Sequence, residues 1–343
     1  MNFIVDRKYA MLAIVIMLMV CTSAFSQIVV LDKTDNHPVA AVSVYNNDDG
    51  SVVGTTNFNG ELPVRTEGLK NISLHHINYY NQDVDLGKVE NGKIFLTPYV
   101  HEIQNVNVTK GNADYVRMKV YIRQYSVLNN QPAYFRESLA YLYFDVKDID
   151  DKPSFKRISE NIYRNKGAFE GKSNVLKSLA MIDNPCQFAS FDLYKCYTKL
   201  KKENRVRSRW QRGGGFMYMN EDEVNHRCEI VLDSLLADKP YNVPLFGFSF
   251  GNIYECDTYS TVYGTPTMVG LQNTYCSFRF YHNKSKEFVD NFIDIYVLGA
   301  EYVSKEQKKA DKKAKPIGFI APGGMPPLNE NIVKALKSMT RIQ

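Results

Sequence analysis

Residues 38–64 read PVAAVSVYNNDDGSVVGTTNFNGELPV. In residues 39–46 both alternating sets of side chains are largely apolar. This pattern predicts a strand that is covered on both faces, as in the interior of a β-sandwich. Residues 46–50 are Asn, Asp and Gly, which predicts a turn, because Asx side chains bond their own backbone and Gly supplies a positive φ. The stretch therefore begins as a strand and a turn.

The second half of the stretch predicts a hairpin. Residues 51–56 read as a short strand, and residues 57–60 form a turn that ends in Asn59-Gly60, the strongest two-residue hairpin signal. Residues 61–64 are then expected as the return strand, with Pro63 tolerated at an edge. The whole stretch predicts a β-meander.

The runs 38–44 and 53–60 resemble the carboxypeptidase regulatory-like domain, a transthyretin-like β-sandwich abundant in envelope proteins of the Bacteroidetes. The family's Gly-Thr-x-Thr-Asp-x-Asn-Gly-x-Phe pattern is matched with Asn57 at the Asp position and Leu62 near the Phe position. The resemblance covers roughly residues 27–109. It implies an accessory or docking module whose motif serves folding, with no catalytic residues.

The chain begins with the features of a secretory signal peptide over residues 1–26. Arg7 and Lys8 supply a basic start, an apolar run follows over residues 11–20, and small residues precede Gln27, the expected new N-terminus. Lipoprotein processing at Cys21 and an uncleaved anchor are the alternatives. We expect an exported protein in the periplasm, or one that is outer-membrane-associated or at the cell surface.

Charge and cysteine content exclude several functional classes. The 343-residue chain carries a net charge of +5, and residues 304–316 hold six Lys against one Glu and one Asp, so it is not a globally basic nucleic-acid binder. Five cysteines follow the signal, without a CxxC pair, which argues against a zinc ribbon or a redox pair. We expect most of them to be buried, and Cys186–Cys196 is the most plausible disulfide by proximity.

The remainder of the first domain predicts more short strands separated by turn residues. With residues 28–31 they complete a seven-stranded transthyretin/Ig-like sandwich over residues 27–110. The expected strands cover residues 71–77, 81–85, 93–97 and 103–109.

Residues 112–303 predict an α+β domain with a large antiparallel sheet. A helix is expected over residues 113–128, because Tyr115, Met118, Ile122 and Tyr125 follow helical spacing. Residues 224–236 fit either a helix or a strand. Further helices are expected over residues 173–182 and 184–202, and further strands over residues 133–147, 241–249, 252–260, 274–281 and 288–298.

The C-terminal tail divides into a linker and a helix. Residues 304–327 are Lys-rich and then rich in Gly and Pro, so we expect a linker. Residues 328–343 contain an amphipathic helix from Asn329 to about Arg341. It either contacts an anionic membrane surface or covers the protein's own core. Its expected apolar face consists of Ile332, Val333, Leu336 and Met339.

Three motifs suggest chemistry that their surroundings do not support. His226 and Glu229 form an HxxE with His282 as the only third zinc ligand, but the remaining context of a zinc carboxypeptidase is missing. Residues 167–173 resemble a P-loop that is one residue short, so a loop at a helix start is the better interpretation. The acidic hairpin tip over residues 145–151 lacks the Gly of an EF-type calcium loop.

Residues 199–212 hold seven basic residues around Trp210. In an exported protein this run suggests a phosphorylated lipid, an acidic glycan or an acidic protein face, and a solvated strand is the rival interpretation. The candidate partner-binding residues are Arg205, Arg207, Arg209, Trp210 and Arg212.

The sequence thus favours a non-enzymatic envelope protein without a cofactor, metal or catalytic residue. Its sandwich would dock, and its second domain would bind a protein or an amphiphilic, lipid-like partner. A periplasmic lipid or lipoprotein carrier with an apolar cavity is one alternative, and a hydrolase with an unrecognised site is the other. The oligomeric state stays open.

Overall fold

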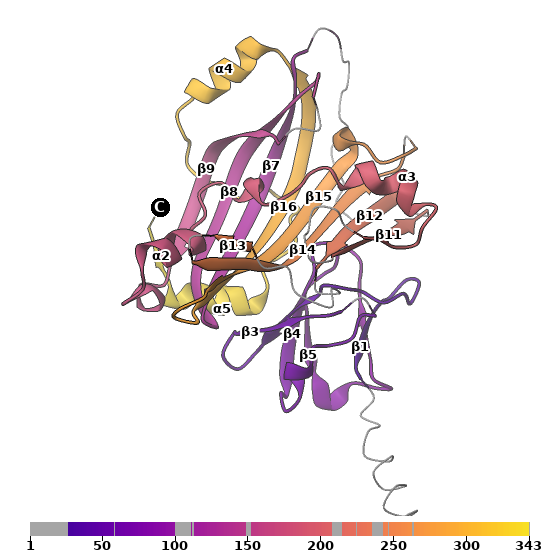
Figure 1. The fold of residues 1–343 in the computed structure, drawn as a ribbon, viewed down its shortest axis with the longest axis vertical. Helices are drawn as coiled ribbons and strands as arrows, with labels where there is room; N and C mark the ends of the chain where they lie inside the picture. Colours follow the sequence, from indigo (N-terminus) through magenta and orange to yellow (C-terminus); the bar gives the residue numbers. More distant parts are fainter. Residues whose placement is uncertain are drawn as a thin grey trace, which may run out of the picture.

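The computed structural model describes residues 27–57, 59–99, 111, 113–148, 152–207, 215–223, 225–234, 243–245, 247–262 and 264–342. This part of the chain is mainly β-structure, with a large antiparallel sheet and a few short helices. The expected fold class is confirmed. Figure 1 shows the N-terminal unit, residues 27–99, at one end of the large sheet, and the C-terminal helices beside that sheet.

The N-terminal unit contains two small sheets that share one core. One sheet pairs β1 with β6 in parallel, and the other has the antiparallel order β3-β2-β4-β5. Val30 and Leu96 from the first sheet are fully buried with Val44, Ile72 and Leu74 from the second. The strands are β1 Val29–Asp32, β2 Ser43–Asn46, β3 Val52–Thr55, β4 Asn71–His75, β5 Gln82–Asp85 and β6 Lys93–Leu96.

Two strands expected in this unit have different outcomes. The return strand over residues 61–64 is wrong: Glu61 makes only an isolated bridge to Val29, and a 3-10 turn follows at Val64–Thr66. Pro63 explains this break, because it cannot donate a hydrogen bond to a neighbouring strand. The strand expected over residues 103–109 lies outside the described residues, so the exact seven-stranded sandwich stays a prediction.

The turn at residues 57–60 forms as predicted. Gly60 N donates to Asn57 O at 2.9 Å, and the Asn57 side chain accepts from Glu61 N at 3.0 Å. Gly60 has φ +72°, and a Cβ there would lie 2.4 Å from Val30 O. Only glycine fits, because β1 passes directly over this turn.

In the described part of the chain, eleven strands form the large sheet. Its order is β10-β11-β12-β14-β15-β16-β7-β8-β9-β17, with β13 paired to β14. Figure 1 shows β9 and β11 near opposite edges. The strands are β7 Tyr115–Leu128, β8 Gln131–Asp145, β9 Ser154–Arg164, β10 Val206–Arg207, β11 Phe216–Asp222, β12 Arg227–Asp233, β13 Val243–Leu245, β14 Phe248–Ser260, β15 Leu271–His282, β16 Phe288–Val303 and β17 Thr340–Arg341.

The helix expected over residues 113–128 is wrong, because this segment is the strand β7. It pairs with β8 and β16 along nearly its whole length. Val116 and Val120 lie in the core on one face of the sheet, whereas Tyr121 and Tyr125 lie in the core on the other. The apolar period is therefore two, and the helical spacing combined residues from both faces.

The helix expected over residues 184–202 is also largely wrong. The segment contains two 3-10 turns, Pro185–Gln187 and Leu193–Cys196, and one helical turn, α3 Tyr197–Leu200. Phe191 between them has φ +56°, which a helix cannot contain. The helix expected over residues 173–182 is confirmed as α2 Asn174–Ala180.

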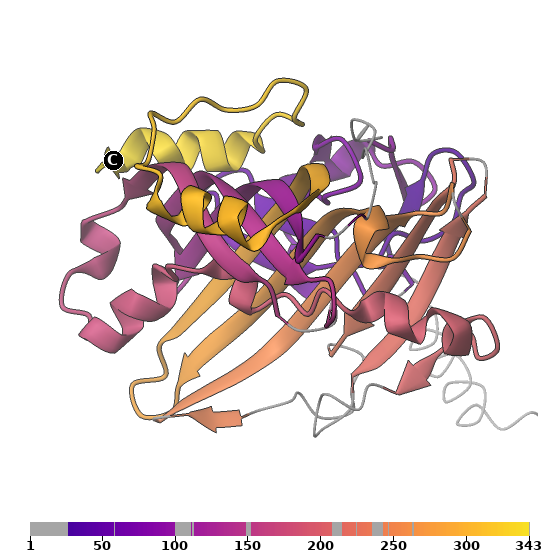
Figure 2. The same cartoon turned by 90° about the horizontal axis from the view of Figure 1, so that it is seen from above.

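Both faces of the large sheet are covered by other parts of the chain. Residues 182–206 pack on one face through side chains that include Phe191 and Leu193. The other face meets the N-terminal unit through Tyr45 and Ile77, and the C-terminal helix through Ile332. Figure 2 shows the N-terminal unit and the C-terminal helix toward the same side of the sheet. The sheet is thus the middle layer of the molecule.

The tail contains two helices where one was expected. The Lys-rich part of the expected linker folds as α4 Lys305–Lys313, which Ser304 caps by accepting from Gln307 N. The amphipathic helix is confirmed as α5 Glu330–Ser338, with Asn329 as its cap. Among the described residues, no helix has the length and apolar character needed to cross a membrane.

Candidate functional site

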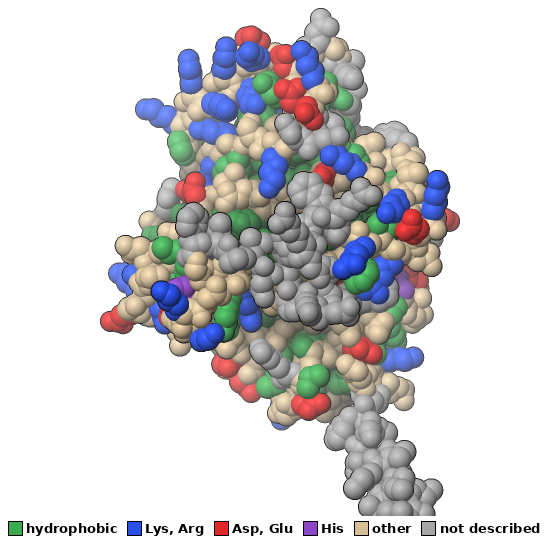
Figure 3. Space-filling view, viewed as in Figure 1, with side chains coloured by type: hydrophobic (Ala, Val, Ile, Leu, Met, Phe, Trp, Pro, Cys, Tyr) green, Lys and Arg blue, Asp and Glu red, His purple; other side chains and the backbone are tan. Residues whose placement is uncertain are grey.

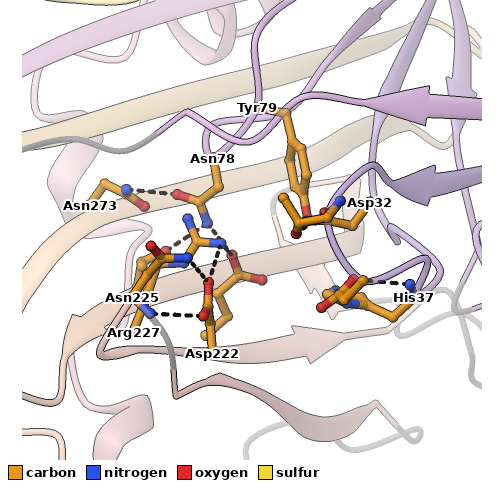
Figure 4. Close-up of polar contacts among 12 residues, drawn as sticks. Asp32, His37, Asn78, Tyr79, Asp222, Asn225, Arg227 and Asn273 are labelled. Carbon is orange, nitrogen blue, oxygen red and sulfur yellow. Dashed lines mark hydrogen bonds and ion pairs between the residues drawn. The ribbon is translucent and has the colours of Figure 1, made fainter.

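The N-terminal unit and the large sheet meet at a buried polar cluster centred on Asn78. The Asn78 side-chain nitrogen donates to Glu229 Oε1 at 2.7 Å and to Thr258 Oγ1 at 2.8 Å. The Asn78 side-chain oxygen accepts from Asn273 Nδ2 at 2.8 Å. Figure 4 shows Asn78 reaching from the N-terminal unit toward Asn273 and Arg227. We call Asn78, Arg227, Glu229, Thr258 and Asn273 the docking network.

The docking network holds its charges in pairs. Arg227 Nη2 lies 3.7 Å from both Glu229 Oε1 and Asp222 Oδ2. Glu229 is 6% exposed, so its carboxylate needs the Asn78 amide and the Arg227 guanidinium to replace water. Among these described side chains, the polar groups form hydrogen bonds and ion pairs with one another. None of them is placed as a nucleophile with a base beside it. The arrangement holds two units together.

Two adjacent histidines lie at the same junction, and their pKa values are shifted in opposite directions. Burial lowers the pKa of His76 to about 3, and the charges of His75 and Arg227 add to this. His76 is therefore neutral and accepts from Asn78 N at 3.2 Å. Burial alone would lower the pKa of His75, but the charge of Asp294 and hydrogen bonds to Asp294 and Asn81 raise it.

A second cluster lies at the end of β1. Asp32, Asp35 and His37 each offer one ligand atom, and these three atoms lie within 4.8 Å of one another, a spacing that a metal ion could use. However, Asp32 already accepts from Thr34 N at 2.6 Å and from Tyr79 OH at 2.8 Å. His37 Nδ1 lies 2.5 Å from Asp35 Oδ1. The cluster is explained as a self-bonded turn, which Figure 4 shows beside Tyr79.

The structure does not bring the HxxE residues together. His226 is exposed in the turn before β12, whereas Glu229 is buried on β12 and bonded to Asn78. In the sheet, Glu229 pairs with Thr258, which pairs with Asn273 on β15. His282 lies nine residues beyond Asn273 along the same strand, which places it about 30 Å from Asn273. These three side chains cannot share one zinc ion.

The short P-loop-like run forms a loop at a helix start, as expected. Residues Gly167–Phe169 make a 3-10 turn, and Ser173 Oγ accepts from Leu176 N at 3.2 Å at the start of α2. Lys172 Nζ is paired with Glu287 Oε1 at 2.6 Å. The lysine therefore holds the loop to the residue that precedes β16.

The candidate partner-binding run is only partly described. The Arg205 guanidinium lies 3.4 Å from the centre of the Phe216 ring, and Arg207 is exposed on β10. Arg209, Trp210 and Arg212 lie outside the described residues, so this surface stays a prediction. At the acidic hairpin tip, Asp145 accepts from Lys147 N at 2.9 Å, and residues 149–151 lie outside the described part.

The disulfide expected between Cys186 and Cys196 is wrong, because both cysteines are free. They lie on separate 3-10 turns that pack on the large sheet. Four of the five described cysteines are buried, as expected, and Cys196 is half-buried. Burial raises the pKa of the Cys186 thiol to about 12 and that of Cys228 to about 12, which leaves both thiols unreactive.

A groove of ≈ 490 Å³ runs along β9. One wall is β9 itself, and the other is the segment Pro316–Phe319, which we call the strap. The strap is fixed by Ile317 N donating to Ile158 O at 3.1 Å and by Phe319 stacking on Tyr121. The β9 groove is lined by Phe155, Lys156, Arg157, Ser159, Glu160, Asp183, Pro316, Ile317, Gly318, Phe319 and Arg341.

Three further hollows lie where the N-terminal unit meets the large sheet. A groove of ≈ 290 Å³ lies between β3 and the sheet strands β14–β16. Two voids at the junction of the N-terminal unit and the sheet measure ≈ 20 Å³ and ≈ 10 Å³. Such voids hold about one water each.

Sequence reasoning missed the docking network and the β9 groove. Asn78 follows the apolar strand β4, but its partner Glu229 lies 151 residues away, and no local pattern connects them. A scan against protein-family models finds no match to the chain, and a search of curated proteins finds no relative either.

Proposed function

We propose that this chain is an exported, non-enzymatic envelope protein that binds an amphiphile with an acidic head group in the β9 groove. The observation that carries the proposal is the lining of that groove. Phe155, Ile317 and Phe319 supply apolar surface, whereas Lys156 and Arg157 supply positive charge. An amphiphile offers the complementary pair, a hydrocarbon chain and a negative head.

The cations of the β9 groove are held in place by the protein. Lys156 Nζ donates to the backbone oxygens of Lys312 and Ala314 at 3.1 and 3.2 Å. Arg157 lies over the Phe155 ring at 5.4 Å and pairs with Asp183 at 3.0 Å. A held guanidinium loses less entropy when it binds an anion, which favours recognition of a phosphate or carboxylate head.

The N-terminal unit would then be the docking module of the envelope protein. Support for this comes from the turn pattern of residues 38–64 and from the resemblance to the carboxypeptidase regulatory-like domain. The apolar run near the start of the sequence supports export through a cleaved signal peptide. Because the docking network fixes this unit to the large sheet, the module would present the β9 groove in a constant orientation.

A non-enzymatic role is proposed because the described residues of the groove lack a nucleophile with an adjacent base. Ser159 is its hydroxyl residue, and the described acidic residues beside it, Glu160 and Asp183, are both paired with Arg157. The hydrolase alternative would need a catalytic set elsewhere in the chain. The groove is also open to solvent, which fits reversible binding at a surface better than enclosure of a whole lipid.

The proposal is tested with two amphiphiles that share one tail. Calorimetric titration with dodecyl phosphate should show saturable binding to the full chain, whereas dodecyl maltoside should bind at least about tenfold more weakly. Organic extraction of the purified protein followed by mass spectrometry should release an acidic amphiphile. Equal affinity for the two compounds, or binding of neither, would remove the proposal.

A further inference from the structure

We infer that α4 and the exposed isoleucines of the segment after it form a contact surface for an anionic lipid bilayer. The surface consists of Lys305, Lys309, Lys312, Lys313, Ile317 and Ile320, which we call the basic ridge. It goes beyond ligand binding in the β9 groove, with which it shares Ile317, and it does not depend on the groove being occupied.

The inner side of α4 is fixed to the sheet by one carboxylate. Asp311 accepts from Arg117 and from Tyr143 OH, the latter at 2.7 Å. Partial burial alone would raise the pKa of Asp311, but these hydrogen bonds lower it, so it stays ionised. Lys308 also faces inward, with its ammonium 3.7 Å from the centre of the Tyr115 ring.

The outer side of α4 is therefore left with lysines. Lys305, Lys309, Lys312 and Lys313 are exposed, and Lys315 follows directly. Of the two acidic residues in the helix, Asp311 is already paired with Arg117, and only Glu306 remains on the exposed part. Figure 3 shows Lys and Arg side chains gathered over α4. Each lysine near an anionic bilayer strengthens binding by about fivefold.

Two large apolar side chains project into solvent next to these lysines. Ile317 is 65% exposed and Ile320 is 80% exposed. Phe319 between them stacks on Tyr121 with ring centres 6.4 Å apart, so the backbone of this segment is anchored. The anchored backbone holds the two isoleucines outward, where water makes their exposure unfavourable. Insertion into the interface of a bilayer would remove that exposure.

Exposed lysines next to exposed isoleucines favour a lipid bilayer over a soluble polyanion as the partner of the basic ridge. Lysines alone would bind either, but exposed isoleucines gain free energy only in an apolar environment. Two alternatives were open for the C-terminal helix, contact with an anionic membrane surface and covering of the protein's own core. Ile332, Ala335 and Met339 of that region are buried against the large sheet, so α5 covers the protein's own core.

The test is co-sedimentation of the full chain with vesicles. Binding should occur with vesicles that contain phosphatidylglycerol and be much weaker with pure phosphatidylcholine. The triple variant Lys309→Gln/Lys312→Gln/Lys313→Gln should lower the partition coefficient by roughly 100-fold. Ile320→Ser should lower it by roughly fivefold. Neither change touches a residue that lines the β9 groove, so binding of dodecyl phosphate should be unchanged.

The matched controls lie on the N-terminal unit. Lys70→Gln/Lys93→Gln removes two exposed lysines, and Val64→Ser removes a side chain that is 71% exposed. Both should bind vesicles like the unmodified chain. The inference is wrong if anionic vesicles bind no protein, if the controls lose as much binding as the ridge variants, or if Ile320→Ser has no effect. The last result would indicate a purely electrostatic polyanion site.

Discussion

Asn78 donates to Glu229 across the junction of the N-terminal unit and the large sheet, at 2.7 Å and over a separation of 151 residues. The same amide nitrogen donates to Thr258 at 2.8 Å. One short polar side chain therefore satisfies a buried carboxylate of the other unit. Because a buried carboxylate without partners is costly, this contact makes the folding of the two units interdependent.

Replacement of Asn78 by Ala should destabilise the protein by about 2–4 kcal/mol, because Glu229 then keeps a buried charge with fewer partners. Urea denaturation monitored by circular dichroism measures this change. Asn204→Ala is the control, since Asn204 is exposed, and it should shift stability by less than about 0.5 kcal/mol. Equal effects of the two changes would show that the docking network contributes nothing to stability.

The ion pair of His75 with Asp294 should make the junction sensitive to pH. The folded-state pKa of His75 is raised from 6.5 mainly by the charge of Asp294, against the effect of burial. The stabilisation of the folded state by this ion pair is thus fully present below pH 6.5, and it is lost as the pH rises through the raised pKa of His75. NMR titration should give a His75 pKa above 6.5, and Asp294→Asn should lower it. An unchanged pKa in that variant would contradict the pairing.

Asp257 should give a pH dependence of the same sign from the opposite face of the sheet. Burial raises the pKa of Asp257 to about 7, although Tyr259 OH donates to it. The unfolded chain loses this proton near pH 3.8, whereas the folded chain keeps it until about pH 7. The stability of the folded state therefore falls as the pH rises from 3.8 to about 7. Asp257→Asn should reduce that fall by an amount of the order of 2–4 kcal/mol. The neighbouring Glu255, whose pKa burial also raises, should keep its own contribution of the same sign.

Denaturation of this variant and of the unmodified chain at several pH values measures the difference. Asp145→Asn is a suitable control, because Asp145 is exposed and its variant should keep the full slope. If Asp257→Asn followed the same slope as the unmodified chain, a proton on Asp257 would not explain the pH dependence.

Gly60 and Gly68 allow steric crowding to be separated from backbone strain. Both have positive φ, +72° and +84°, but a Cβ at Gly60 meets Val30 O at 2.4 Å and a Cβ at Gly68 meets nothing within 4 Å. Gly68→Ala should cost about 1 kcal/mol from φ alone. Gly60→Ala should cost roughly 3 kcal/mol or more, since β1 must also shift. Thermal unfolding of both variants provides the comparison, and equal losses would mean that β1 does not press on this turn.

The sequence predicted the parts of the fold that local patterns determine. The turns at residues 46–50 and 57–60 carry their own Asx and Gly chemistry, and the strand expected over residues 133–147 is observed as β8, so these features were identified correctly. β7 was misjudged because it is buried on both faces. When both alternating sets are apolar, residues spaced by three or four can be chosen that imitate a helix.

The sites could not be predicted, because they depend on contacts between distant segments. The wall of the β9 groove is held by the hydrogen bond of Ile317 to Ile158 and by Lys156, which reaches the backbone at the end of α4 and just after it. The lysines of residues 305–315 were recognised as a charged segment. Asp311 pairs with Arg117 on β7, which leaves the outer side of α4 basic. This pairing could not be predicted without knowing where β7 lies.

The central claim, that the β9 groove binds an acidic amphiphile, is tested most directly by blocking the groove. A Cβ at Gly318 has no atom within 4 Å, so Gly318→Trp can fill the groove without disturbing the strap, and Gly323→Trp places the same side chain in another open position outside it. In calorimetric titration with dodecyl phosphate, Gly323→Trp should match the unmodified chain, and Gly318→Trp should lose at least about tenfold in affinity. Unchanged affinity of Gly318→Trp would contradict the account.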